Sequence, residues 1–334
     1  MKSIKQFLCF CLIATILFSC QEFHSVAPIS EAASISRLHV DGKYLKNAKN
    51  KTVQLKGIST HGISWYPEYI NDKCFKQLHK WGANVVRLAM YSSEYNGYCT
   101  GDEANKKALK KRIETGVKLA KKYKMYVIID WHIMNTDGNP LIHEKEAREF
   151  FTWASKKFKN TPNVIYEICN EPCNGTTWND ITSYANNIIP IIRKKASKSV
   201  IIVGTPNWSQ ELDKAVAAPL TYKNIMYALH FYAATHGDDL RKVLTLALNN
   251  GLPVFVSEFS ICDASGNGSI DIDSAAQWMS LIRKNKISYC IWNLSNKNEA
   301  SAIIKSSVSK TSGFTVSDLT KTGKWWKSQL KKKG

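Results

Sequence analysis

Proline and glycine are scarce in this chain, which has 9 prolines and 17 glycines among its 334 residues. No stretch rich in proline, glycine or serine divides the sequence, and it contains no internal repeat or low-complexity tract. Domain boundaries usually fall in such flexible linkers. We therefore expect one domain, from residue 37 to residue 334.

Apolar runs long enough to cross a bilayer are also lacking. The run at residues 7–18 is too short for this, and it follows Lys2 and Lys5. A short apolar run after positive charges is typical of a signal peptide. We expect residues 1–20 to be such a peptide and residues 21–36 to be a tether.

The end of this run resembles the cleavage box of a bacterial lipoprotein, Leu-Phe-Ser-Cys, with Cys20 as the lipidated residue. The alternative is an ordinary secretory peptide cut near the small residues at 32–34. Both interpretations predict an exported bacterial protein. It would be secreted in one case and held at the cell surface by a lipid anchor in the other.

Acidic residues are few relative to basic ones: 27 Asp and Glu stand against 46 Lys and Arg, so the net charge is +19. Removal of Lys2 and Lys5 with the signal would lower it to +17. Such charge can indicate a nucleic-acid partner. Here the lysines are scattered over predicted helix faces, with no basic run interleaved with aromatics. We expect a solvated lysine-rich surface and no nucleic-acid partner.

The cysteine pattern lacks the two matched pairs of a zinc site, because Cys169 and Cys173 have no second pair. Three of the nine cysteines lie in the predicted signal, and six remain for disulfides or for the core. Cys74 and Cys99 are one candidate bridge. The sequence implies neither a metal nor a cofactor.

What the chain does contain is an alternation of β-branched runs and amphipathic stretches. Eight strands with helices between them predict a (β/α)₈ TIM barrel, and residues 37–55 predict a β-hairpin that closes its bottom. A doubly wound sheet is the alternative, but no glycine-rich phosphate loop follows the first strand. The predicted strands are 53–58, 84–90, 125–131, 164–169, 199–204, 225–231, 253–258 and 288–294.

Two of the apolar runs end in glutamates. Residues 164–169 are followed by Asn170-Glu171-Pro172, and residues 254–257 are followed by Glu258. Carboxylates at the ends of two barrel strands can converge on one bond, as glycoside hydrolysis requires. Most of the other predicted strands also end in polar or aromatic residues that core packing does not explain: His61, Arg87, Asp130, His132, His230, Tyr232, Trp292 and Asn293.

These stretches resemble the bacterial endoglucanase (cellulase) subfamily of glycoside hydrolase family 5. The resemblance extends over residues 37–331 and is carried by residues 55–62, 85–91, 127–132, 163–172, 227–232, 256–258 and 291–295. It implies a retaining endo-β-1,4-glucanase, monomeric and without a cofactor. The partner would be a β-glucan polysaccharide or its cello-oligosaccharides.

The resemblance implies a role for each matching residue of the catalytic centre. Glu171 would be the acid/base and Glu258 the nucleophile. Arg87 would keep Glu258 ionised, and Tyr232 would donate a hydrogen bond to it. Asn170 would bond the sugar 2-hydroxyl.

Further residues would bind the sugar chain by the same resemblance. His132 and His230 would flank the sugar at the cleavage point, His61 would bond the sugar behind it, and Trp292 would be the floor beneath that ring. The remaining expected sugar contacts are the platforms Trp65 and Trp208, the loop residues Lys297 and Glu299, and Tyr91.

The sequence departs from the family after the nucleophile, where Phe259-Ser260 replaces the usual Trp-Gly. We expect activity to be kept, because Phe preserves an apolar plug. Two other functions stay open: a hydrolase of the same fold that acts on mixed-linkage glucan, xyloglucan or mannan, and a non-catalytic surface glycan-binding protein.

Overall fold

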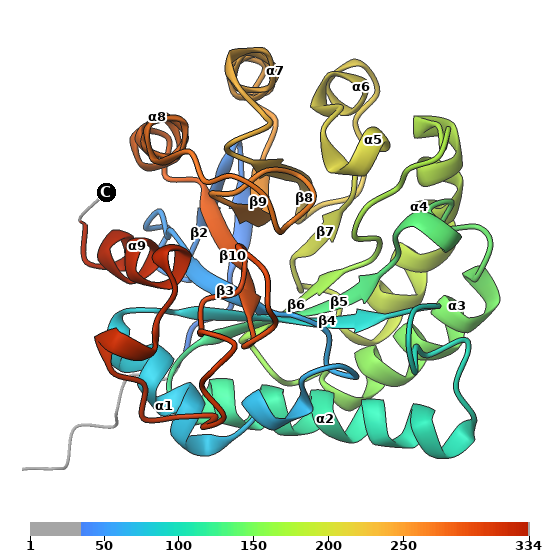
Figure 1. The fold of residues 1–334 in the computed structure, drawn as a ribbon. Helices are drawn as coiled ribbons and strands as arrows, with labels where there is room; N and C mark the ends of the chain where they lie inside the picture. Colours follow the sequence, from blue (N-terminus) through green and yellow to red (C-terminus); the bar gives the residue numbers. More distant parts are fainter. Residues whose placement is uncertain (1–34, 333–334) are drawn as a thin grey trace, which may run out of the picture. The chain divides into compact units, whose positions relative to one another are not determined.

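The computed structural model of the protein describes residues 35–332. Eight parallel strands form a closed barrel with helices around it (Figure 1). The predicted TIM barrel is therefore confirmed. The strands are β3 (Lys56–Thr60), β4 (Val85–Tyr91), β5 (Tyr126–His132), β6 (Val164–Glu167), β7 (Ile201–Val203), β8 (Ile225–Tyr232), β9 (Val254–Ser260) and β10 (Ser288–Leu294).

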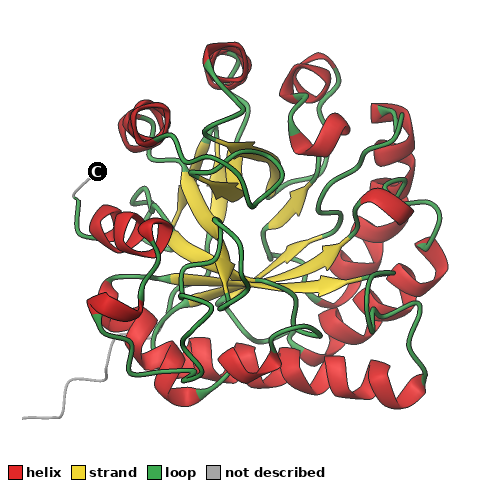
Figure 2. Ribbon diagram, in the orientation of Figure 1, coloured by secondary structure: helices red, strands yellow, loops and turns green. Residues whose placement is uncertain are grey.

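The helices lie outside the strands and bury their apolar faces against them (Figure 2). Capping side chains begin several of them, for example Asn71 at α1 and Asp102 at α2. The α-helices are α1 (Asp72–Trp81), α2 (Glu103–Lys122), α3 (Glu144–Lys157), α4 (Trp178–Lys195), α5 (Pro206–Ser209), α6 (Leu212–Ala217), α7 (Asp238–Asn249), α8 (Ile272–Lys284) and α9 (Lys321–Leu330). Short 3₁₀ turns occur at η1 (Pro67–Tyr69), η2 (Asn135–Asp137) and η3 (Val316–Asp318).

The predicted hairpin is present as β1 (His39–Asp41) and β2 (Tyr44–Lys46). It places Leu38 and Leu45 against the inner apolar residues of the barrel, among them Ile128 and Phe255. This apolar cluster, which we call the bottom plug, closes the end of the barrel where the strands begin. The opposite end is left for polar side chains.

The first barrel strand begins later than predicted. Residues 53–55 do not belong to it, because Val53 N–H bonds Leu45 O (2.8 Å) and Leu55 N–H bonds Ser288 Oγ (2.9 Å). The segment therefore crosses under the barrel before it enters the sheet at Lys56. An apolar pattern alone does not distinguish these two environments.

The candidate bridge between Cys74 and Cys99 does not form, because both thiols are free. Cys74 is fully buried on α1 and packs as an apolar side chain. Burial raises the pKa of its thiol to about 12. The predicted signal peptide, Cys20 and residues 21–34 of the predicted tether lie outside the described residues. Among residues 35–332, no helix is both long and apolar enough to span a membrane.

Candidate active site

Glu171 and Glu258 face each other at the end of the barrel where the strands finish. Glu258 lies on β9, and Glu171 lies in the loop after β6. A carboxylate oxygen of each lies within 4.8 Å of the other, and both side chains line one cleft. Retaining glycosidases hold their two carboxyl groups roughly 5–5.5 Å apart, whereas inverting enzymes need a wider gap for water. The pair therefore has the short spacing of a retaining site.

Arg87 lies directly behind this pair and is completely buried. Its guanidinium contacts three carboxylates: Glu258 (Nη1–Oε2, 3.1 Å), Glu167 (Nε–Oε2, 2.7 Å) and Asp130 (Nη2–Oδ2, 3.0 Å). Burial opposes its charge, but the three carboxylates raise the pKa of Arg87 well above its ordinary value. A permanent cation is therefore fixed against the Glu258 carboxylate.

The second oxygen of Glu258 also has a donor. Tyr232 Oη donates to Glu258 Oε1 at 2.8 Å. Burial, and then the charges of Glu258 and Glu171, raise the pKa of Tyr232 well above its ordinary value. The phenol therefore stays a donor, and the two donors hold the Glu258 carboxylate in a single orientation.

Glu171 is held by a histidine. His230 Nδ1 lies 2.9 Å from Glu171 Oε1, and its Nε2 lies 2.9 Å from Ser257 Oγ. Burial disfavours the imidazolium, but the carboxylates of Glu167 and Glu171 raise the pKa of His230 to about 9. Glu167 acts on His230 through an ion pair, since Glu167 Oε1 is 3.9 Å from His230 Nε2. A protonated His230 donates from both nitrogens and orients Glu171.

Asn170 is fully buried and does not line the cleft. Its Oδ1 accepts from Arg87, and its Nδ2 donates to Ile133 O at 3.0 Å. The expected contact with a sugar 2-hydroxyl would therefore use the remaining Nδ2 hydrogen, which faces His132 Nε2 at 3.4 Å. Burial, and then the charge of Arg87, lower the pKa of His132 to about 3, so this ring is neutral.

The cleft has a volume of about 780 Å³ and brings together most of the predicted residues. Trp65 and Trp208 are unusually exposed for tryptophans, at 42% and 37%. Exposed indoles on a cleft wall can stack on sugar rings. Two predicted residues, Arg87 and Asn170, lie behind the wall of the cleft. The other twelve line it: His61, Trp65, Tyr91, His132, Glu171, Trp208, His230, Tyr232, Glu258, Trp292, Lys297 and Glu299.

Trp292 and the loop after β10 form one side of this cleft. The Trp292 ring is stacked near His132, with 5.3 Å between the ring centroids and 12° between the planes. Lys297 Nζ contacts both Glu299 Oε2 (2.7 Å) and His61 Nε2 (3.2 Å). Burial, and then the charge of Lys297, lower the pKa of His61 to about 4, so it is neutral.

Two supporting acidic residues were assigned no role from the sequence, although Asp130 was noted at the end of a predicted strand. Asp130 and Glu167 do not reach the cleft, but together with Glu258 they surround the guanidinium of Arg87. Their signal in the sequence is a carboxylate inside or at the end of a β-branched strand, as in Val-Ile-Tyr-Glu. Several further cleft residues, most of them in loops, were also not predicted: Glu94, Met134, Asn135, Asn207, Gln210, His236, Ala264, Ser265 and Gly266.

Glu171, His230 and Glu258 together offer three ligand atoms within 4.8 Å, which is also suitable spacing for a metal ion. His230 and Glu171 are hydrogen-bonded to each other, however, and Glu258 is held by Arg87 and Tyr232. The same three groups are arranged as an oriented acid beside an ion-paired carboxylate, which is the equipment for acid/base and nucleophilic chemistry.

Known proteins are similar to this chain in sequence. A sequence model of the family described as cellulase (glycosyl hydrolase family 5) matches residues 46–298. Endoglucanase A of Butyrivibrio fibrisolvens is 47% identical over 296 residues, which cover 88% of this chain and 68% of that protein. An endoglucanase of Clostridium saccharobutylicum is 44% identical over 306 residues, which cover 90% of this chain and 67% of that protein.

Solved structures share the fold as well. The catalytic domain of Thermobifida fusca endoglucanase Cel5A has a TM-score of 0.84 and 35% identity, with 89% of this chain and 98% of that chain covered. A variant of that domain was solved in complex with cellotetraose. The family match spans most of the folded domain, and the chain therefore belongs to glycoside hydrolase family 5.

Proposed function

We propose that the protein is a retaining endo-β-1,4-glucanase that cleaves internal bonds of a β-glucan chain. The observation that carries this proposal is the short Glu171–Glu258 spacing, with a buried arginine and a tyrosine on Glu258 and a histidine on Glu171. Relatives named endoglucanase support the substrate class.

In the first step, Glu258 attacks the anomeric carbon while Glu171 gives its proton to the departing glycosidic oxygen. The bond to the leaving sugar breaks, and a covalent glycosyl-enzyme forms. Arg87 and Tyr232 hold Glu258 so that one oxygen points at the sugar. This orientation lowers the entropic part of the barrier.

In the second step, Glu171 is a carboxylate and removes a proton from water. The water attacks the anomeric carbon from the face that the leaving sugar vacated, and Glu258 is released. Two inversions give net retention. His230 keeps Glu171 in place through both steps, because it donates to the same oxygen throughout.

Binding of the glucan chain is assigned to the aromatic walls. Trp292 lies near the catalytic pair, and Trp65 and Trp208 are the exposed platforms of the cleft. Cello-oligosaccharides are the expected small ligands, as in the cellotetraose complex of the Thermobifida fusca domain. We also propose that the protein acts as a monomer.

The test is release of reducing ends from carboxymethylcellulose. Glu258→Gln should abolish it, because an amide cannot form the glycosyl-enzyme, while binding of cello-oligosaccharides is kept. Glu103→Gln, an exposed residue on α2, is the matched control and should keep full activity. Unchanged turnover in Glu258→Gln would exclude the proposed nucleophile.

The stereochemistry and the substrate can be tested separately. Proton NMR of early products should show the β-anomer first, whereas an α-anomer would contradict the retaining mechanism. A panel of cellulose, lichenan, mannan and xylan should show the highest rate on β-1,4-glucan. A preference for mannan would keep the mechanism but replace the substrate.

We propose, finally, that the chain is exported and lipid-anchored through Cys20. Support comes from the sequence alone: the basic start, the short apolar run and the box that ends at Cys20. Metabolic labelling with palmitate should mark the protein in bacterial cells, and Cys20→Ala should remove the label. Labelling that persists in this variant would exclude Cys20 as the anchor.

A further inference from the structure

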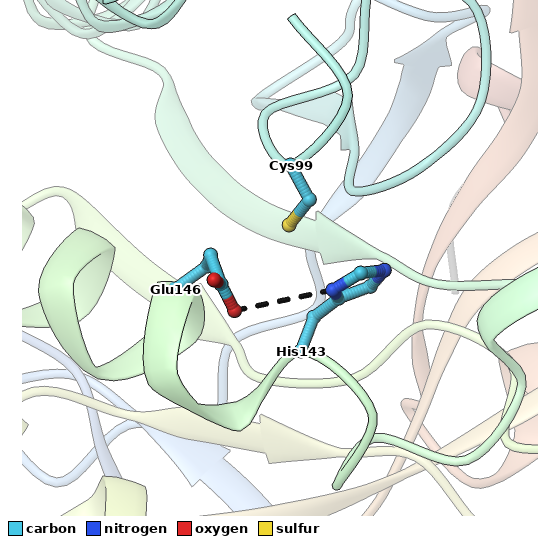
Figure 3. Close-up of side chains that lie close together, drawn as sticks. All are labelled: Cys99, His143 and Glu146. Carbon is cyan, nitrogen blue, oxygen red and sulfur yellow. Dashed lines mark ion pairs between the residues drawn. The ribbon is translucent and has the colours of Figure 1, made fainter.

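A second group of ligand-type side chains lies outside the catalytic pair. Cys99 belongs to the loop between β4 and α2, while His143 and Glu146 belong to the start of α3. One ligand atom from each lies within 4.8 Å of the other two. Figure 3 shows the three side chains pointing toward a common space from two separate segments. His143 Nδ1 and Glu146 Oε2 are 3.9 Å apart.

These side chains have little else to do in the described part of the chain. Within residues 35–332, the Cys99 thiol, the His143 imidazole and the Glu146 carboxylate make no hydrogen bond, and the ion pair between His143 and Glu146 at 3.9 Å is their one polar contact. His143 stands at the N-cap of α3 yet makes no capping bond, whereas Asn71, Asp102 and Thr177 cap their helices. The usual role of that position therefore does not explain the histidine.

From this arrangement we infer that Cys99, His143 and Glu146 form a binding site for a zinc-like divalent cation. Thiolate, imidazole and carboxylate are ligand types that Zn²⁺ accepts together, and a sulfur ligand disfavours Ca²⁺ and Mg²⁺. Three protein ligands leave the fourth tetrahedral position to water. The Cys99 thiol gives up its proton when the ion binds.

The geometry requires only small movements. Zinc bond lengths place tetrahedral ligand atoms about 3.4–3.6 Å apart, so the cluster would need to contract by at most about 1.3 Å from its 4.8 Å limit. Rotation of the two side chains on α3 can supply this, because His143 and Glu146 are 27% and 32% exposed. The Cys99 backbone is fixed, since its N–H bonds Ser92 O at 2.7 Å.

Binding would join two segments that form one wall of the cleft. The loop that carries Cys99 also carries Glu94, and the segment before α3 carries Met134 and Asn135, all of which line the cleft. The ion would therefore act as a staple that holds this wall, separate from the acid and nucleophile. It would stabilise the folded chain by mass action, because the unfolded chain lacks the site.

The experiment is a zinc titration of the full chain after treatment with a chelator, read by competition with a chromophoric chelator. We expect one Zn²⁺ per chain and a higher thermal midpoint with Zn²⁺ than without. Cys99→Ser should lower the affinity at least tenfold, and so should Glu146→Gln. His79→Gln, an exposed histidine on α1, is the control and should bind like the parent protein.

Cobalt gives a second readout that needs neither activity nor stability. Co²⁺ should produce a thiolate charge-transfer band in the near ultraviolet, and this band should be absent in Cys99→Ser. Equal affinity in all of these variants would overturn the site. So would a loss of binding in Glu258→Gln alone, because it would place the ion at Glu171, His230 and Glu258. If Cys99→Ser does not fold, the zinc affinity of Glu146→Gln tests the site, and an unchanged affinity in that variant would overturn it.

Discussion

At the scale of single residues, Arg87 is central to the site although its side chain does not line the cleft. It contacts carboxylates from β5, β6 and β9, and its Nη1 donates to Ser59 Oγ on β3 at 3.2 Å. One side chain therefore links four strands and orients Glu258, the proposed nucleophile. We expect stability and the proposed activity to depend on the same buried charge cluster.

Arg87→Met should destabilise the fold by about 3–5 kcal/mol, because it leaves buried carboxylates without their cation. Urea unfolding followed by circular dichroism measures this. Arg148→Met, on the surface of α3 and 3.6 Å from Glu144, should cost less than about 1 kcal/mol. Equal losses in both variants would contradict the assigned role of Arg87.

Tyr232→Phe should lower kcat on carboxymethylcellulose by about 10–100-fold, because a hydrogen bond to a charged group contributes roughly 1.5–3 kcal/mol. The reason is the loss of one donor on Glu258, so KM should change little. Tyr44→Phe, in the hairpin, is the control. A change in KM alone would assign Tyr232 to substrate binding instead of nucleophile positioning.

The sequence allowed Glu171 and Glu258 to be placed at one end of the barrel, because each follows a mainly apolar run that predicts a strand. It did not allow Glu167 to be assigned a role, since its partner Arg87 is 80 residues away. Cys99 was considered only as a disulfide candidate, and His143 was not singled out, for the same reason. Contacts between distant residues leave no local pattern unless a barrel register is assumed.

At the scale of elements, α9 seals the seam where the barrel closes between β3 and β10. Trp326 is fully buried, and its Nε1 donates to Gly57 O on β3 at 3.1 Å. The helix lies close to the chain after β10, because a Cβ on Gly323 would come within 2.2 Å of Ile303 O. A glycine is therefore required at this position, because the helix backbone lies too close to Ile303 for a larger side chain.

Gly323→Ala should therefore destabilise the protein by about 1–3 kcal/mol, although alanine favours helices. Lys324→Ala, exposed on the same helix, should be neutral or slightly stabilising. Thermal unfolding of the two variants compares them directly. An increase in the midpoint for Gly323→Ala would show that α9 can move away from Ile303 without cost.

Most elements could be predicted from the sequence, because strands and helices of a barrel alternate with clear periodicity. The exceptions lie at the edges of elements. Residues 53–55 look like strand but pair with the hairpin and with Ser288. Asn207 and Trp208 have positive φ values of 55° and 56°, which place the indole in the cleft by a backbone conformation that no propensity predicts.

At the scale of the whole molecule, buried histidines of opposite behaviour should set the pH range of stability. Relative to the ordinary value of 6.5, the pKa is raised to about 9 in His230 and lowered to about 3 in His132. The contribution of His230 to the free energy of unfolding is complete below pH 6.5 and is lost as the pH rises through 9. The contribution of His132 is complete above pH 6.5 and is lost as the pH falls toward 3.

The free energy of unfolding should therefore be highest near pH 6.5 and fall on both sides. Urea titrations between pH 5 and about pH 9.5 measure this. His230→Gln should flatten the alkaline side, and His132→Gln should reduce the slope on the acid side. A stability that rises steadily from pH 6.5 to 9 would contradict the assigned charge of His230.

The bottom plug has a consequence for how such a protein can change over generations. Its apolar residues and the hairpin lie at the end of the barrel opposite Glu171 and Glu258. Loops at the open end can then be replaced, lengthened or mutated toward other polysaccharides while the closed end keeps the chain folded. Protein engineers can use the same separation, first raising heat tolerance in the plug and then diversifying the loops without starting from a marginal scaffold.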